Sequence, residues 1–223
     1  MQRGHTSRIV ITAGVMCVTA LLVVAAFAQQ HHTSPHAVAN DFVLDSGAAA
    51  ISLRQIDVHA ARESTPALHE PNFKALTEAS VRDSDTGILI AHAGEQRFYP
   101  HTILAWHEVV NDSFGNDAVA VVFCPRTETG TAFHRQTGEE TLRFGVSGLQ
   151  YDGMSLLYDY GTETLWLGTR GLGAVGELSG TQLQEMKTQT LDAGTVRERY
   201  PLATTLTTDT GFDRNYQINP FKE

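Results

Sequence analysis

Residues 9–28 form the longest uninterrupted apolar segment of the chain and contain no charged residue. Arg3 and Arg8 precede this segment, and it ends in Ala26-Phe27-Ala28, the small-x-small pattern that signal peptidase recognises. The pattern predicts that residues 1–28 are a signal peptide and that the protein is extracytoplasmic, either periplasmic or secreted. Because the segment is 20 residues long, it also has the length of a membrane span, and an uncleaved N-terminal anchor is the alternative.

Residues 29–50 lack a sustained hydrophobic period and are rich in His, Ala, Ser and Asn. This composition is typical of a flexible tether between a cleavage site or membrane anchor and a domain. We therefore expect the folded unit to begin near Ile51 and to comprise residues 51–223 as a single compact domain.

Within residues 51–223, short apolar runs alternate with glycine-bearing turns. The runs 88–90 and 96–99 flank Ala93-Gly94 and predict a hairpin. The run 118–123 is continuous and rich in β-branched residues, which predicts a strand buried on both faces that ends at Cys124. Further strands are expected at 131–135, 141–146, 155–159 and 164–167, and brief helices at 103–111, 182–186 and 195–200. The predicted fold class is mainly β, a β-rich α+β domain of short strands with a few short helices.

The composition and net charge exclude some classes of protein and of binding partner. The chain has 223 residues, with 16 Lys and Arg against 25 Asp and Glu, and a formal net charge of −9 at pH 7. A content of 42% hydrophobic and 18% charged residues excludes a disordered or fibrous protein. Nucleic-acid binding depends on clustered Lys and Arg, and the sequence has no such cluster, so no nucleic-acid partner is expected. Membrane contact is expected only through an uncleaved N-terminal segment, and no pattern identifies a small-molecule or protein partner.

The number of cysteines restricts the roles that Cys124 can have. The chain has two cysteines, Cys17 and Cys124, and cleavage after residue 28 leaves only Cys124. An odd cysteine in an oxidising compartment cannot form an internal disulfide. Three roles therefore remain open for Cys124: it is buried and inert, paired with another molecule, or used as a thiolate.

Several familiar catalytic motifs are incomplete in this sequence. It has neither a Walker loop nor a dinucleotide fingerprint, so nucleotide cofactors have no support. Residues 145–149 begin like a nucleophile elbow, but Leu149 stands where the second glycine is required. His107-Glu108 begins like a zinc-peptidase helix, but Asn111 stands where the second histidine is required. These departures argue against serine-hydrolase and zinc-peptidase chemistry.

Three segments stand out in order: residues 97–100 leading into Trp106-His107-Glu108-Val109-Val110-Asn111-Asp112, then Phe123-Cys124-Pro125, then Phe144-Gly145-Val146-Ser147-Gly148-Leu149. Their order and composition resemble the uncharacterised prokaryotic family called domain of unknown function 3179. Later segments at 158–166, 175–180 and 200–212 agree with that family, so the resemblance covers residues 66–221. The chain departs from the family pattern at Arg126, Glu128, His134 and Tyr160, which identifies it as a divergent member. The resemblance implies a fold and the position of a site, but no reaction.

Within these segments, Cys124 and His107 are the pair that we expect to carry the chemistry. A thiolate and an imidazole select copper, zinc or iron in an exported protein, and we favour copper over zinc. Glu108 or Asp112 is expected to add a ligand or to orient the His107 ring. His134 is expected to add a nitrogen that the typical family member lacks. The competing interpretation of Asp112 and its neighbour Asn111 is that they end a helix and form a turn.

Three functions follow from this pair. The first is a mononuclear metal site, with copper favoured, for redox chemistry or metal handling. The second is a metal-free thiol enzyme in which Cys124 is the nucleophile and His107 its base. The third is a non-catalytic binding module with a vestigial site, and the sequence does not decide whether the protein is an enzyme.

Overall fold

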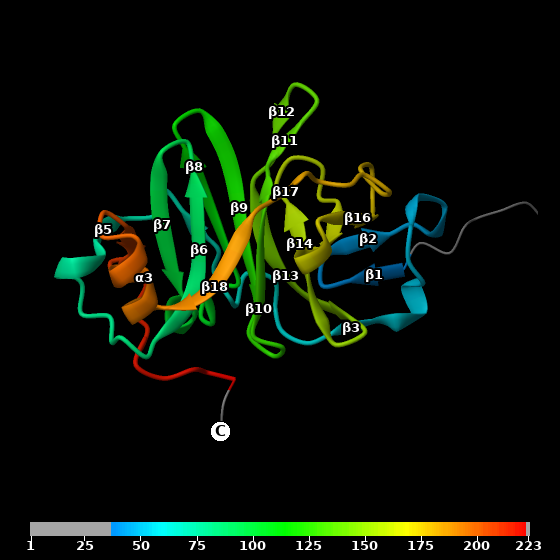
Figure 1. Cartoon of the computed structure of the whole chain (residues 1–223). Helices are drawn as coiled ribbons and strands as arrows, with labels where there is room; N and C mark the ends of the chain where they lie inside the picture. The colour runs from blue at the N-terminus through cyan, green and yellow to red at the C-terminus, as the bar shows by residue number, and fades with distance from the viewer. Residues whose placement is uncertain (1–36, 222–223) are drawn as a thin grey trace, which may run out of the picture. The chain divides into compact units, whose positions relative to one another are not determined.

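The computed structural model describes residues 37–221, which belong to one compact unit. Three five-stranded sheets form its layers (Figure 1). The central sheet has the order β17 (Glu185–Met186), β10 (Thr129–His134), β9 (Asp117–Cys124), β8 (Val109–Phe114) and β4 (Leu68–His69). The predicted class, a mainly β domain with few short helices, is confirmed.

The central sheet lies between the other two. The β6–β7 sheet has the order β18 (Thr188–Asp192), β6 (Thr86–His92), β7 (Glu95–Pro100), β19 (Thr204–Leu206) and β5 (Phe73–Ala75). The β13–β14 sheet has the order β16 (Leu172–Val175), β15 (Leu165–Leu167), β14 (Met154–Asp159), β13 (Phe144–Tyr151) and β3 (Ile56–Val58). Figure 1 shows the β6–β7 sheet on the left and the β13–β14 sheet on the right.

The side chains of β9 point alternately to the two faces of the central sheet, so that this strand contributes to the cores on both sides. Val121 and Phe123 point into a core shared with Ile88 and Tyr99 of the β6–β7 sheet. Val122, between them, points to the opposite side, into a core shared with the β13–β14 sheet. Successive side chains of a strand point to opposite faces, so a strand covered on both faces requires a continuous apolar run. The prediction of a doubly buried strand ending at Cys124 is therefore confirmed.

Thin outer layers cover the two flanking sheets. α3 (Ala193–Arg199), whose first turn is capped by the Asp192 side chain, buries Val196 against the β6–β7 sheet. On the other side, β1 (Ala37–Ala39) and β2 (Phe42–Leu44) form a hairpin that buries Phe42 and Leu44 against the β13–β14 sheet. The expected tether over residues 29–50 is therefore wrong from residue 37 onwards, because these two apolar side chains find a core. Residues 1–36, including the expected signal or anchor at 1–28, lie outside the described residues.

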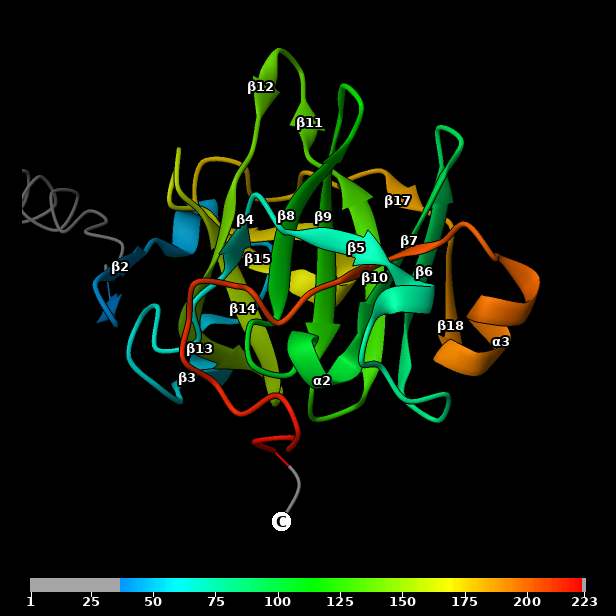
Figure 2. The same cartoon turned by 90° about the vertical axis from the view of Figure 1, so that its left-hand side faces the viewer.

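The remaining elements are short. They are α2 (His101–Leu104), the hairpin strands β11 (Gln136–Thr137) and β12 (Glu140–Thr141), and the 3-10 turns η1 (Ser46–Ala48), η2 (Leu53–Gln55), η3 (Leu76–Glu78) and η4 (Gly168–Arg170). After β19, residues 207–221 contain neither a helix nor a strand. Figure 2 shows this segment in orange and red, crossing the side of the unit that carries α2. No helix within residues 37–221 is long and apolar enough to cross a membrane.

Several local predictions are settled by the strand register. The hairpin around Ala93-Gly94 is confirmed as β6 and β7, and both turn residues have positive φ, as a tight hairpin turn requires. The expected helix at 195–200 is confirmed as α3. The expected helix at 182–186 is wrong, because Glu185–Met186 pairs with β10 as β17. The short helix expected after Pro100 is confirmed at its start, because α2 begins at His101, but its expected extent to residue 111 is wrong: α2 ends at Leu104, and β8 begins at Val109.

Candidate functional site

Glu108 occupies a strained turn between α2 and β8. Its φ is +57°, in the left-handed region, and the N–H of Val109 donates to the carbonyl oxygen of His107 at 2.6 Å, so that a γ-turn is centred on Glu108. Turns of this hand are rare and strained for residues other than glycine. The turn points the Glu108 and His107 side chains into different surroundings.

The Glu108 side chain is buried, with 5% of its surface exposed. Its oxygen Oε2 is buried without any hydrogen-bond partner. Burial raises the pKa of Glu108 above its ordinary value, and the interaction of the carboxyl group with the Ser155 side chain opposes only part of this effect. Strain together with an unpartnered buried polar atom is more typical of a functional residue than of a structural one.

Glu108 meets Cys124 in a small cavity between the central sheet and the β13–β14 sheet. This cavity, the inner chamber, has a volume of about 10 Å³ and is lined by Glu108, Cys124, Met154, Ser155 and neighbouring core residues. The N–H of Phe123 donates to the carbonyl oxygen of Glu108 at 2.8 Å, which brings the end of β9 against the turn. Cys124 is 6% exposed and is not in a disulfide. Cys124 and Glu108, whose oxygen Oε2 has no hydrogen-bond partner, therefore line the same small cavity.

A second cavity adjoins the inner chamber. This outer chamber has a volume of about 70 Å³, and its walls include His59, Ser64, Thr65, Gln150 and Phe221. Glu108 and Ser155 line both chambers, and therefore stand between them.

The backbone of β13 forms one wall of the outer chamber. The pairing of β13 with β14 shifts register between Val146 and Gln150, and Gly148 lies inside this shift with φ +75°. A Cβ at Gly148 would come within 2.3 Å of the Ala60 carbonyl oxygen. The Ser147 hydroxyl donates to the Leu156 carbonyl oxygen at 2.5 Å. The Phe-Gly-Val-Ser-Gly-Leu segment is thus a supporting wall of the site, as its strand-and-turn pattern indicates.

His107 faces away from the inner chamber. Its Nδ1 lies 2.8 Å from the carbonyl oxygen of Pro66, and its Nε2 lies 2.7 Å from the hydroxyl of Tyr216. Because a carbonyl can only accept, Nδ1 carries the proton, and Nε2 of the neutral ring accepts from Tyr216. Burial lowers the pKa of His107, which favours this neutral ring. Both nitrogens are engaged, so the expected pairing of His107 with Cys124 is not formed in this arrangement.

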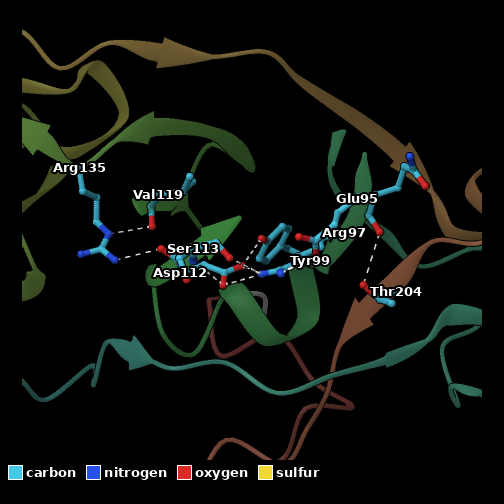
Figure 3. A network of polar contacts seen from close by, with 9 residues as sticks. Glu95, Arg97, Tyr99, Asp112, Ser113, Val119, Arg135 and Thr204 are labelled. Carbon is cyan, nitrogen blue, oxygen red and sulfur yellow. Dashed lines mark hydrogen bonds and ion pairs between the residues drawn. The ribbon is translucent and has the colours of Figure 1, made fainter. Parts of the chain in front are cut away.

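Asp112 is held in a closed polar network (Figure 3). Its carboxylate accepts two hydrogen bonds from Arg97 Nη1, at 2.7 and 2.8 Å, and one from the Tyr99 hydroxyl at 2.5 Å. An N–H of Arg135 donates to the Asp112 carbonyl oxygen at 3.0 Å. These bonds join β7, β8 and the residue after β10. Asp112 is therefore an ion-pairing residue within a strand, and its expected role at the end of a helix is wrong.

His134 and Asp112 both lie far from Cys124. Each is paired with Val119, which is five residues before Cys124 on β9. At about 3.3 Å per residue, this separation is about 17 Å along the strand. His134 instead packs against His92 with ring centroids 5.8 Å apart, and His92 Nε2 lies 2.6 Å from Asp117 Oδ2. Of the expected additional ligands, only Glu108 lies beside Cys124.

Asn111 joins the central sheet to the β13–β14 sheet. Its Nδ2 donates to the Phe144 carbonyl oxygen at 2.8 Å, and its Oδ1 accepts from the Phe144 N–H at 2.8 Å. The side-chain amide thus imitates the pairing of a neighbouring strand. Asn111 positions the two sheets between which the inner chamber lies.

Residues 37–221 contain no group of three or more His, Cys, Asp or Glu side chains arranged to hold a metal ion. Met154 and Ser155 were not expected at the site, because they open an ordinary strand after the Gly153 turn. Only the pairing of β13 with β14 brings them to Cys124.

Comparison with known proteins identifies the family to which the chain is similar. No curated protein and no solved structure matches the chain. Residues 62–223 match the family described as "Protein of unknown function (DUF3179)". This range contains Glu108, Cys124 and the other segments on which the resemblance was based, and the chain therefore belongs to the DUF3179 family.

Proposed function

We propose that this protein is an extracytoplasmic metal-handling protein that binds one Cu(I) ion in the inner chamber, with Cys124, Met154 and Glu108 as ligands. The observation that supports the proposal is that Cys124 lines the same small cavity as Glu108, whose buried oxygen Oε2 has no hydrogen-bond partner. A buried carboxyl oxygen without a partner is costly, and a bound cation would satisfy it.

The identity of the metal is argued from the donor set. Cys124 and Met154 offer a thiolate and a thioether, and these soft ligands select Cu(I). Zinc, the alternative, takes four ligands in structural sites, commonly Cys and His. The histidine expected beside Cys124 is bonded to Pro66 and Tyr216 instead, which favours copper over zinc. The inner chamber, at about 10 Å³, has room for a single ion.

A thiol enzyme is the second candidate, with Glu108 in the role expected of His107. Glu108 lines the same chamber as Cys124, and burial raises the pKa of its carboxyl group, as suits a general base. In this mechanism Glu108 would accept the thiol proton as Cys124 attacks a substrate. The chambers do not identify the substrate.

The test is an anaerobic Cu(I) titration of residues 29–223, purified after export without chelators or a His tag, against a competing chromophoric chelator. Wild type is expected to bind one Cu(I), and Cys124→Ser to bind none. Met154→Leu is expected to weaken binding about tenfold or more. Met186→Leu is the matched control, because Met186 is a buried methionine in the other core of the central sheet and should bind like wild type.

Two results would contradict the metal proposal. One is unchanged binding by Cys124→Ser, and the other is the absence of copper from wild type even after reconstitution. In the second case, alkylation of Cys124 by iodoacetamide tests the thiol enzyme. Slower alkylation of Glu108→Gln than of wild type would support Glu108 as the base, and an equal rate would reject it.

A further inference from the structure

The residues after β19 form a segment, here called the C-terminal strap, that comprises residues 207–221. Residues 207–209 are joined to Asn72 by two hydrogen bonds, at 2.9 and 3.1 Å, and residues 210–221 are joined to the rest of the described chain by two more. Trp106 Nε1 donates to the Ile218 carbonyl oxygen at 3.1 Å, and the Tyr216 hydroxyl donates to His107 Nε2. Segments with so few bonds open locally at low free-energy cost.

Tyr216 is the anchor of the strap. It is 8% exposed and belongs to the core between the central and β6–β7 sheets. Because its proton is donated to His107, its hydroxyl oxygen accepts a 2.5 Å hydrogen bond from the Thr210 hydroxyl, which joins two parts of the strap. Apart from this anchor, the large apolar side chains of the strap are exposed: Phe212 by 40%, Ile218 by 53% and Phe221 by 45%.

The end of the strap forms part of the outer chamber wall, through Phe221. The opposite wall is firmer, because the N–H groups of His59 and Ala60 both donate to the Gly148 carbonyl oxygen of β13, at 2.9 and 3.0 Å. Glu108 and Cys124 are almost fully buried, so a ligand reaches them only if a wall moves. The last part of the strap, residues 217–221, is joined to the rest of the described chain by one hydrogen bond, from Trp106 to Ile218.

We propose that the C-terminal strap is a gate over the site of Glu108 and Cys124, and that the hydrogen bond between Tyr216 and His107 is its latch. The identity of the admitted ligand, Cu(I), rests on the proposed function, whereas the gating itself does not. The proposal gives the Trp-His-Glu segment two tasks: Trp106 and His107 hold the strap closed, and Glu108 faces the ligand.

The test is the rate at which iodoacetamide alkylates Cys124 in the native, metal-free protein. Cys124 is the only cysteine of residues 29–223, so the reaction reports this site alone. Tyr216→Phe keeps the ring and removes the latch together with the Thr210 hydrogen bond, and it is expected to raise the rate about fivefold or more, since one lost hydrogen bond alone is worth about 1 kcal/mol. Phe221→Ala, which opens the chamber wall without touching the latch, is also expected to raise the rate.

Tyr200→Phe is the control, because Tyr200 loses a hydroxyl that accepts from Gln189 beside α3. It should react like wild type. Urea unfolding measures the global stability of each variant. It therefore shows whether faster alkylation comes from local opening of the strap or from global unfolding. The gate is refuted if Tyr216→Phe and Phe221→Ala react at the wild-type rate, or if their rates rise only in proportion to lost global stability. Because alkylation needs no metal, failure of copper binding leaves this result unaffected.

Discussion

Replacing Glu108 by glycine is expected to stabilise the protein by about 1 kcal/mol, although Glu108 is buried. Relief of the left-handed backbone contributes about 1–2 kcal/mol. Removal of a buried carboxyl oxygen without a partner contributes about 1–3 kcal/mol. Against these gains stand two buried methylenes at about 0.8 kcal/mol each and the extra chain entropy of glycine, about 0.5–1 kcal/mol.

The assay is urea denaturation at pH 7 of wild type, Glu108→Gly and Glu108→Ala. Alanine removes the same carboxyl group and keeps the backbone penalty, but it also keeps one buried carbon, about 0.8 kcal/mol, and avoids the extra chain entropy of glycine, so Glu108→Gly should be about as stable as Glu108→Ala. The control is Thr131, an interior residue of β10, where glycine should instead be less stable than alanine by about 0.5–1 kcal/mol.

Two outcomes would refute the reasoning about Glu108. If glycine were less stable than alanine at Glu108 by as much as at Thr131, the backbone at Glu108 would not be left-handed. If Glu108→Gly were less stable than wild type by more than about 2 kcal/mol, Glu108 would contribute to the fold as an ordinary buried residue does.

Further predictions concern the surroundings of the site. Because burial raises the pKa of Glu108, the folded state holds this proton more tightly than the unfolded state, and wild type loses stability as the pH rises above the ordinary carboxyl value of 4.5. The stability of Glu108→Gln relative to wild type should therefore increase from pH 4 to pH 8 in urea titrations, and a constant difference would contradict the shift. Asn111→Ala should cost about 2–4 kcal/mol in the same assay, because it leaves the N–H and carbonyl of Phe144 unpaired, and a cost below about 1 kcal/mol would contradict the link between sheets. Asp112→Ala should lower stability by about 3 kcal/mol because it removes the carboxylate that accepts from Arg97 and from the buried Tyr99 hydroxyl, although Arg97 keeps its ion pair with Glu95, and it should leave the Cu(I) stoichiometry of the folded protein unchanged. If folded Asp112→Ala did not bind copper, Asp112 would have to be a copper ligand, which would contradict the proposed site.

The strands were predictable where one local pattern decided the structure. The apolar run of β9 and the hairpin of β6 and β7 have unambiguous periodicity, and both predictions are confirmed. The segment 103–111 failed because its apolar spacing fits a helix, whereas Val109 and Val110 pair with Val122 and Val121 of β9. Pairing with a distant strand overrides local propensity, and the sequence alone does not display it.

The candidate site was predictable only in part. Cys124 and Glu108 were singled out from their motifs, and the structure brings these two together. The expected partner His107 adjoins Glu108 in sequence, but the γ-turn sends the two side chains in different directions. Its actual partner, Tyr216, is 109 residues away along the chain. Met154 carried no signal, since nothing in its local sequence distinguishes a ligand from a strand residue.

X-ray absorption at the copper edge of the Cu(I)-loaded protein tests the central claim most directly, because it reports the atoms bound to the metal. The account predicts two sulfur neighbours and one oxygen neighbour in wild type, and one sulfur fewer in Met154→Leu. It predicts no imidazole scattering, because His107 stays bonded to Pro66 and Tyr216. An imidazole signal that disappears in His107→Gln or His134→Gln would contradict the account and restore the Cys and His site expected from the sequence.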